Sequence, residues 1–303
     1  MAESTLSVSY ITLVREIARQ LGYGLTYATG TVTSSGTTLT LTGGTWPSWL
    51  GTTSVGSAAV NIAGVFYTVA SRTNDTVIVL GADPSATTAA YVAVQSRTNE
   101  LTDTFQSIQD CIDEGYREFC MPPSPARDMP FYVWSWLLEQ GSITLATSDY
   151  DYDLPDDFAQ YMLAMTYALG VTHEPPEFVT QMEMRGKQSR DNDSGVPAYL
   201  TWRQKAFTSS TGRRFEALVH PTPTAEVNTK TIEFLYRVLP NQLTPANLYP
   251  LCGAMHSDTL LKACQAAAER KIDNAAGVYA ATYQERLAAS IQADLAVKQT
   301  MGI

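Results

Sequence analysis

Five aspartates lie within residues 148–158, SDYDYDLPDDF, and carboxylates this close together can bind a metal ion or act as a general acid and base. As a calcium loop the stretch fails, because Leu154 stands where the sharp turn needs glycine and Gln160 where a bidentate glutamate belongs. As a catalytic pair it has no histidine or lysine nearby in the sequence. Tyr150 and Tyr152 alternate with the aspartates, which predicts a strand with an acidic face, followed directly by the start of a helix.

Other residue types that could carry chemistry are also poorly placed. The three histidines are scattered and lack cysteine or histidine neighbours at ligand spacing. The chain contains no nucleophile elbow and no glycine-rich phosphate-binding motif. We therefore predict no enzymatic activity, no metal site and no cofactor. The tryptophan pairs in TWPSW (Trp46, Trp49) and VWSW (Trp134, Trp136) are predicted to be core or interface residues, with stacking on sugar rings as an alternative for the first pair.

The acidity is concentrated in one part of the chain. The net charge is −10, and residues 99–170 alone hold 13 acidic and 2 basic residues. This balance argues against tight binding of nucleic acid, which needs Lys and Arg to neutralise phosphates, and suits a surface that DNA passes without sticking. We expect neither a secretory signal nor a membrane helix, and the four cysteines fit reduced thiols better than a disulfide framework.

Hydrophobic periodicity predicts an α+β protein with a mainly α-helical core. The core comprises residues 1–23 and 98–303, and a small antiparallel β-sandwich or barrel, residues 24–97, is inserted in it. Residues 24–97 are rich in Thr, Ser and Gly and alternate as strands do, for example in GTTLTLTGG. Within the core we expect a short amphipathic helix in SVSYITLVREIARQLG, preceded by serines, and a second helix at residues 159–170. We also expect a strand pair from FEALVHPTP and TKTIEFLYRVLP. The segment at about 257–299 is predicted to be one long helix or a bent pair of helices. The length and alanine content of this last helix predict a close-packed partner, either another helix or another subunit.

An ordered set of segments goes beyond fold class. IQDCIDEGYREFC, WSWL, ITLATSDYDYDLPDDF, VPAYLTWR, EALVHPTPTAE, IEFLYRVLP and YPLCGAMHSDTLLKACQAAAERKID follow one another in this sequence. In this order they resemble the head-to-tail adaptor (connector) family of tailed bacteriophages, over roughly residues 99–290 and the first helix. The insert is similar to a β module that recurs in phage structural proteins.

The resemblance implies a virion protein at the head-tail junction, assembled in the host cytoplasm. Family members form a ring of about twelve copies beneath the portal, which extends the DNA channel and carries the next tail or nozzle protein. It also implies that the C-terminal tail contacts the portal: Ala296, Val297, Lys298, Gln299, Thr300, Met301, Gly302 and Ile303. The acidic stretch is the candidate channel-facing surface: Asp149, Asp151, Asp153, Asp156 and Asp157. Trp134 and Trp136 are candidates for subunit contacts or for the core.

Two alternatives remain open at this point. The chain could be a receptor-binding or carbohydrate-binding tail protein that uses the β module and Trp46. It could also be a hydrolase that uses two of its many carboxylates, for example in cell-wall degradation.

Overall fold

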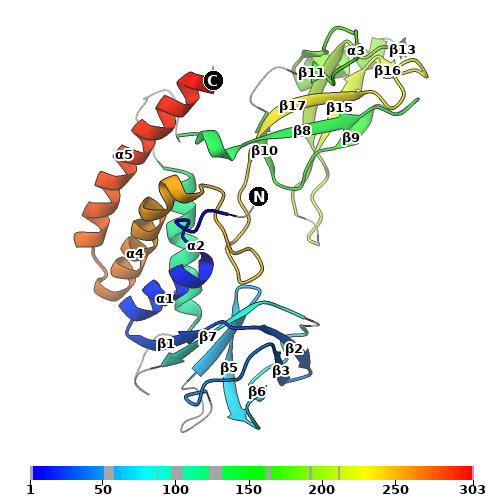
Figure 1. The fold of residues 1–303 in the computed structure, drawn as a ribbon. Coiled ribbons are helices and arrows are strands. Elements are labelled where there is room, and N and C mark those ends of the chain that lie inside the picture. The colour runs from blue at the N-terminus through cyan, green and yellow to red at the C-terminus, as the bar shows by residue number, and fades with distance from the viewer. Residues whose placement is uncertain are drawn as a thin grey trace. The chain divides into compact units, whose positions relative to one another are not determined.

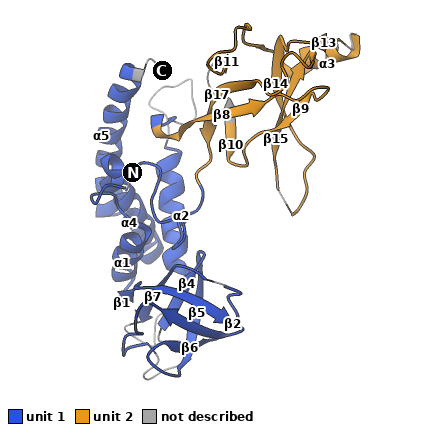
Figure 2. Ribbon diagram, turned by 45° about the vertical axis from the view of Figure 1, so that its right-hand side comes forward, with its two compact units in different colours: residues 1–135, 241–303 blue, residues 136–240 orange. Residues whose placement is uncertain are grey.

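The chain folds into two compact units, shown in two colours in Figure 2. Unit 1 comprises residues 1–135 and 241–303, and unit 2 comprises residues 136–240. Each unit is described by itself below. The computed structural model describes residues 3–50, 58–86, 88–96, 105–122, 132–161, 165–190, 193–210 and 212–301.

In the described part of unit 1, the helical elements are four helices and a short 3-10 turn, Ala254–His256 (Figure 1). Helix α4 packs against each of the other three helices, and its buried alanines allow them to approach closely. The first helix follows the predicted pattern: Leu13, Val14 and Ile17 are buried, and the Ser9 side chain caps the first turn. The helices are α1 (Tyr10–Gln20), α2 (Gln106–Cys120), α4 (Ser257–Asp273) and α5 (Val278–Met301).

A seven-stranded antiparallel sheet forms the rest of unit 1. Its strand order is β1-β7-β4-β5-β6-β3-β2. The sheet curls, because the β2 edge returns to the residues before β7: the Val32 N–H donates to the Ala89 carbonyl at 2.9 Å. The strands are β1 (Tyr23–Tyr27), β2 (Thr31–Ser35), β3 (Thr38–Thr42), β4 (Ala58–Ile62), β5 (Val65–Arg72), β6 (Val77–Leu80) and β7 (Tyr91–Ser96).

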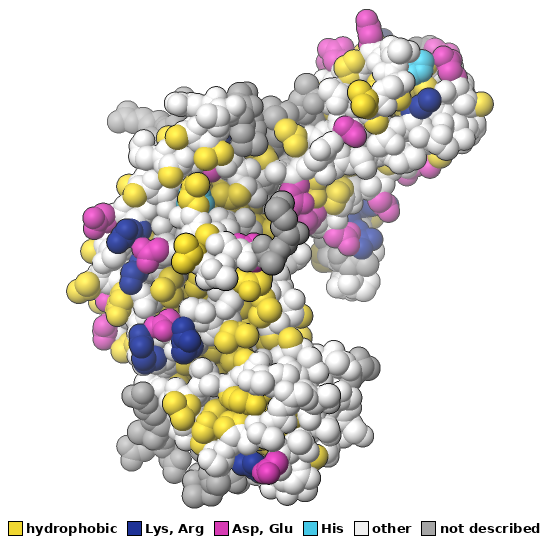
Figure 3. All heavy atoms as spheres, in the orientation of Figure 1, with side chains coloured by type: hydrophobic (Ala, Val, Ile, Leu, Met, Phe, Trp, Pro, Cys, Tyr) yellow, Lys and Arg dark blue, Asp and Glu magenta, His cyan; other side chains and the backbone are white. Residues whose placement is uncertain are grey.

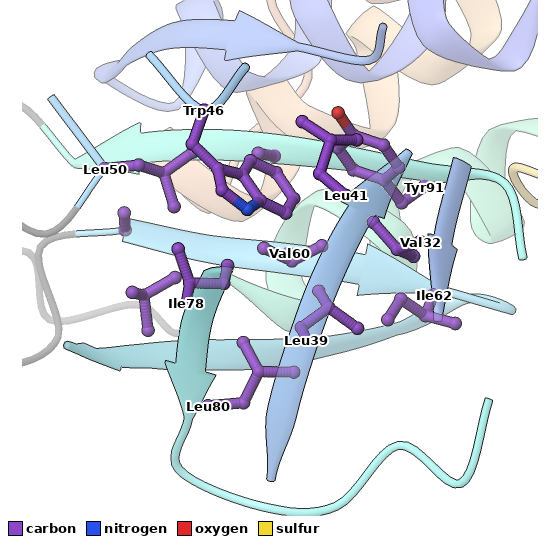
Figure 4. Packing of buried hydrophobic residues seen from close by; sticks show 13 residues of the cluster. Val32, Leu39, Leu41, Trp46, Leu50, Val60, Ile62, Ile78, Leu80 and Tyr91 are labelled. Atoms are coloured by element: carbon purple, nitrogen blue, oxygen red, sulfur yellow. The ribbon is translucent and has the colours of Figure 1, made fainter. Parts of the chain in front are cut away.

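The core of this curled sheet comes from the alternating pattern of its strands. In β3, Leu39 and Leu41 are buried while Thr40 between them and Thr42 after them are exposed. Figure 4 shows these leucines pointing toward Trp46 and Ile78 from neighbouring segments. The sheet is tied to the helices at the β4–β5 turn, where the Gln106 amide of α2 accepts from the Phe66 N–H and donates to the Gly64 carbonyl.

Unit 2 is built mainly from strands, arranged in two four-stranded sheets and one small pair. The first sheet contains β8 (Leu138–Thr144), β10 (Phe158–Tyr161), β11 (Thr166–Tyr167) and β17 (Thr231–Val238). The second has the order β12-β14-β15-β9, from Glu177–Phe178, Tyr199–Gln204, Phe215–His220 and Asp151–Asp153. The small pair joins β13 (Ser194–Gly195) and β16 (Thr222–Pro223). Apolar residues of both larger sheets form one core, and helix α3 (Gln181–Arg190) lies on the outer face of the second. A 3-10 turn, Ser135–Leu137, precedes β8.

The prediction of a mainly α-helical core is wrong. Among the described residues, 31% are in helices and 31% are in strands, and the strands form four sheets. The predicted strand pair is also wrong, because β15 and β17 belong to different sheets: β15 pairs with β14 and β9, whereas β17 pairs with β8, β10 and β11.

The predicted helix at residues 159–170 is not present in the described part of that range, which holds β10 and β11. Both strands pair with β17, whose residues are buried alternately along its whole length. A central strand of this kind needs partners on both sides, and β8 covers one side while β10 and β11 cover the other. Periodicity in a short apolar run does not distinguish a buried strand from a buried helix. The acidic stretch therefore joins a strand to a strand, and the predicted strand-to-helix junction is wrong.

Of the two forms predicted for the C-terminal segment, the structure has the pair of helices: α4 and α5 form an antiparallel hairpin (Figure 1). Asn274 ends α4 in the left-handed conformation, with φ 50°. The Glu269 carboxylate, 8% exposed, accepts hydrogen bonds from the backbone N–H groups of Gly277, Tyr279 and Ala280 at the start of α5. The alanine-rich segment was predicted to pack closely against another helix or another subunit. For α4, the partners are other helices of the same chain.

Glu269→Gln is expected to lower the free energy of unfolding of unit 1 by about 1 kcal/mol at pH 7, because the charged cap at the start of α5 is lost. Burial alone would raise the pKa of Glu269, but the backbone N–H donors outweigh it and hold the pKa below its ordinary value. The difference between wild type and variant should therefore be present at neutral pH and disappear as the pH falls through the depressed pKa. Urea denaturation between pH 7 and pH 3 measures this.

The control for this prediction is Glu285→Gln on the exposed face of α5. Its effect should stay within about 0.5 kcal/mol across the same pH range, as is usual for surface substitutions. Equal effects of the two variants, or a difference that does not shrink as the pH falls, would contradict the capping role of Glu269.

Candidate functional site

Two of the five aspartates in the acidic stretch are neutralised by cations of the same unit. Asp153 in β9 forms an ion pair with Lys205, and this hydrogen bond raises the pKa of the lysine. Asp156, in the turn after β9, lies 3.0 Å from a guanidinium nitrogen of Arg214. The Lys205 ammonium also lies 3.5 Å from Glu216, so it links two carboxylates on the outer face of the second sheet. These contacts fix the strand and its turn, which is a structural use of the charge.

The other three aspartates differ from one another. Asp157 accepts a hydrogen bond from the Tyr236 hydroxyl at 3.0 Å, and burial together with this contact raises the pKa of the phenol. Asp149 and Asp151 have no Lys or Arg partner in the described part of the chain. The five carboxylates do not converge on one point, and the described residues contain no group of three His, Cys, Asp or Glu side chains that could hold a metal ion.

The C-terminal segment is held to the body of unit 1 by a buried carboxylate, Asp294 of α5, which is 0% exposed. Its oxygens accept from the Tyr132 hydroxyl at 2.6 Å and from the Ser135 backbone N–H at 3.1 Å. Lys298, one turn later, lies 3.5 Å from the same carboxylate and 4.1 Å from the centre of the Tyr132 ring, and it also donates to the Val133 carbonyl. Burial lowers the pKa of Lys298, and Asp294 opposes that shift.

The residues predicted to contact the portal thus differ in their surroundings. Ala296, Gln299 and Thr300 are exposed and Val297 is half-buried, whereas the Lys298 side chain is 15% exposed and points into the fold. The Met301 side chain, Gly302 and Ile303 lie outside the described residues.

The tryptophans are mainly core residues. Trp134 is fully buried, its ring N–H donates to the Phe119 carbonyl at 2.8 Å, and its ring packs against Tyr132. Trp136 is half-buried. Trp46 is 2% exposed, and its ring meets that of Tyr91 edge-on at 5.1 Å between centroids. A sugar ring has no access to the faces of Trp46, so the structure removes the main residue behind the carbohydrate-binding alternative.

A family model described as SU10 adaptor protein matches residues 84–301, more than two thirds of the chain. The chain belongs to the SU10 adaptor protein family. This is a family of phage head-tail adaptors, which confirms the resemblance seen in the sequence and makes the protein a structural component of the virion. No curated protein matches the chain.

The match covers the parts of the adaptor in which the assembly surfaces were predicted. It includes α2, all of unit 2, α4 and α5, and it begins after most of the curled sheet of unit 1. The adaptor has no helix among the described residues that combines the length and apolarity of a membrane span.

The structural roles of three residues in the helices of the adaptor were not predicted from sequence: Asp294, Glu269 and Gly115. Asp294 and Lys298 are four residues apart, a spacing typical of exposed helical ion pairs, so the sequence gives no sign that the pair is buried. Glu269 lies in a segment that was predicted to be one long helix or a bent pair, and the sequence did not place the break between the helices. Gly115 contacts α4, a partner almost 150 positions away in the sequence. Their roles depend on long-range contacts.

Proposed function

We propose that this adaptor assembles as a closed ring beneath the portal, extends the channel through which DNA passes, and provides the platform for the next tail component. The observation that carries the proposal is the adaptor family match across α2, unit 2, α4 and α5. A ring of about twelve copies follows from analogy with the family, and heterologous contacts that close on themselves are the general way to build one.

Helix α5 supports lateral assembly. It buries one face, including Tyr283, Leu287 and Ile291, against α4. Its other face is exposed and rich in alanine. Small side chains permit close approach of a neighbouring helix, so this face suits packing against an adjacent copy. The exposed alanines are Ala281, Ala288, Ala289, Ala293 and Ala296.

The distribution of charge supports a passage that does not hold DNA. On the face seen in Figure 3, the Lys and Arg side chains stand beside Asp and Glu and do not form a continuous basic surface. Arg270, for example, lies 2.6 Å from Glu118 and 2.8 Å from Glu114. Tight binding of nucleic acid needs uncompensated cations along the phosphate path. The channel-facing role of the acidic stretch stays a prediction.

The portal contact can be tested by two truncations of α5. Ending the chain after Lys298 removes residues 299–303 and keeps the Asp294–Lys298 pair. We expect portal binding to weaken by at least about tenfold, since exposed contact residues are lost, while the melting temperature stays unchanged. Ending the chain after Asp294 should weaken binding and also lower the melting temperature, because Lys298 is lost. Co-sedimentation with the portal protein and calorimetry measure the two effects.

Wild-type portal binding by the first truncation would contradict the assignment of the tail. The adaptor proposal itself would stand in that case, provided that the full-length protein binds the portal. A full-length protein that does not bind the portal would contradict the proposal as a whole.

A further inference from the structure

Among the described residues, the second sheet of unit 2 ends in two edge strands of different chemistry. Its strand order, β12-β14-β15-β9, places β12 at one edge and β9 at the other. An edge strand offers unpaired backbone groups and is a common place for another chain to dock. Contacts that build a ring from identical copies must join two different surfaces of the same protein. The two edges of this sheet meet that requirement.

At the β12 edge, a groove of about 620 Å³ lies between the strand and α3. Its apolar lining includes Val179 and Met182, and Met182 is 84% exposed. Phe178 in β12 is also 41% exposed. Helix α3 is held on the sheet by Met184, which packs with Val179 and Leu218. The groove therefore combines a fixed wall, which includes the largely buried Val179, with one exposed apolar side chain, Met182, and the exposed Phe178 belongs to the neighbouring strand.

The α3 side of the groove is basic. Lys187 and Arg190 line it, and the Lys187 ammonium lies 3.3 Å from the centre of the Tyr199 ring. Arg190 has no carboxylate partner in the described residues. Two glutamates also line the groove, Glu177 and Glu183. The Glu183 carboxylate accepts from the Thr180 N–H at 2.8 Å and caps α3, so its charge serves the helix.

At the β9 edge, residues 149–151 carry the complementary set. Asp149 and Asp151 are the two carboxylates of the acidic stretch with no cationic partner in the described chain. Tyr150 between them is 45% exposed, although most large aromatic side chains of unit 2 are buried or half-buried in its core. An aromatic residue flanked by unpaired acids matches a groove with an apolar wall and two basic side chains, of which Arg190 has no carboxylate partner in the described chain.

We propose that the groove between β12 and α3 of one copy binds residues 149–151 of a second copy, head to tail. In this contact Tyr150 lies against Val179 and Met182, and its flanking aspartates face the basic side of α3. The contact deepens the proposed ring, on which it rests, by naming the surfaces that join neighbouring subunits. It assigns Asp149 and Asp151 to a subunit contact in place of the channel-facing role expected from sequence.

A charge exchange tests the contact in the full-length protein. One variant carries Asp149→Lys and Asp151→Lys, a second carries Lys187→Glu and Arg190→Glu, and a third carries all four changes. Self-association is measured by sedimentation velocity and native mass spectrometry at low salt, alone and on the portal. We expect each two-site variant to associate at least about tenfold more weakly than wild type, because the two surfaces then carry charges of the same sign. The four-site variant should regain most of the lost affinity, because its two surfaces again carry charges of opposite sign. Unchanged melting temperatures exclude unfolding as the cause.

The outcomes separate this contact from the ring itself. If wild type and all three variants form the same assembly, subunits join through other surfaces; the contact is then wrong and the ring proposal stands. If both two-site variants associate more weakly and the four-site variant does not regain association, the proposed charge pairing between these two surfaces is wrong. If wild-type copies do not associate, alone or on the portal, both the ring and the contact are contradicted.

Discussion

Gly115→Ala is expected to lower the free energy of unfolding of unit 1 by about 3 kcal/mol, because an alanine side chain has no room where α2 crosses α4. A Cβ atom at this position would lie 2.5 Å from the Cα and the backbone nitrogen of Cys264 and 2.8 Å from the carbonyl carbon of Ala263. These are main-chain atoms, so relief requires the two helices to separate. The calorimetric transition of unit 1 should move down by about 6 to 12 °C.

The matched control is the same substitution in α3, Gly186→Ala. Nothing lies within 4 Å of a Cβ atom there. Alanine has the higher helix propensity, so this variant should gain about 0.5 to 1 kcal/mol in unit 2. Opposite signs for the two variants would identify helix crossing as the cause. A Gly115→Ala protein as stable as wild type would mean that α2 and α4 do not approach as closely as described.

Asp294→Ala is expected to lower the free energy of unfolding of unit 1 by about 3 to 5 kcal/mol, because it leaves the largely buried Lys298 side chain without its counter-charge and the Tyr132 hydroxyl without its acceptor. The last turns of α5 should also exchange their amide hydrogens faster, since Asp294 joins the helix to the segment around Ser135. Urea denaturation gives the first effect, and hydrogen exchange followed by mass spectrometry gives the second.

The comparison for this variant is Asp258→Ala. Asp258 lies 3.3 Å from Arg286, and both side chains are 57% exposed. A surface ion pair of this kind contributes about 0 to 1 kcal/mol. Similar losses for the Asp258 and Asp294 variants would show that burial of the Asp294 carboxylate does not matter for stability.

The elements with strong periodic patterns were predictable from sequence. The first helix shows an apolar face at helical spacing with a serine before it, and α1 is confirmed with Ser9 as its cap. The alternation in GTTLTLTGG likewise appears as β3, with buried leucines and outward threonines. In both cases the local pattern and the tertiary contacts agree, so the local pattern suffices.

The strand pairing of unit 2 could not be predicted from local patterns. Its strands are short, several are two to four residues long, and their pairing depends on segments far apart in the chain. The segments of β15 and β17 were predicted to be strands, but a strand pattern does not say which strand is the neighbour. The break between α4 and α5 depends on Glu269, whose capping role needs the folded hairpin.

The residue composition of the candidate surfaces was predictable from the sequence, but the ion-pair partners of their charged residues were not. The concentration of aspartates in residues 148–158 is evident from sequence, yet Lys205 and Arg214, which neutralise two of them, come more than fifty residues later. Lys298 was predicted to be an exposed tail residue because its contact with Tyr132, which is far away in the sequence, forms only in the folded chain. A charge in a sequence has no known partner until the chain is folded.

The mass of the assembled protein tests the central claim most directly. Native mass spectrometry of the purified full-length protein, alone and mixed with the portal, gives the number of copies. The account predicts a closed ring of about twelve copies, or a monomer that joins the portal in that number. A monomer or trimer that does not bind the portal would contradict the proposed ring beneath the portal.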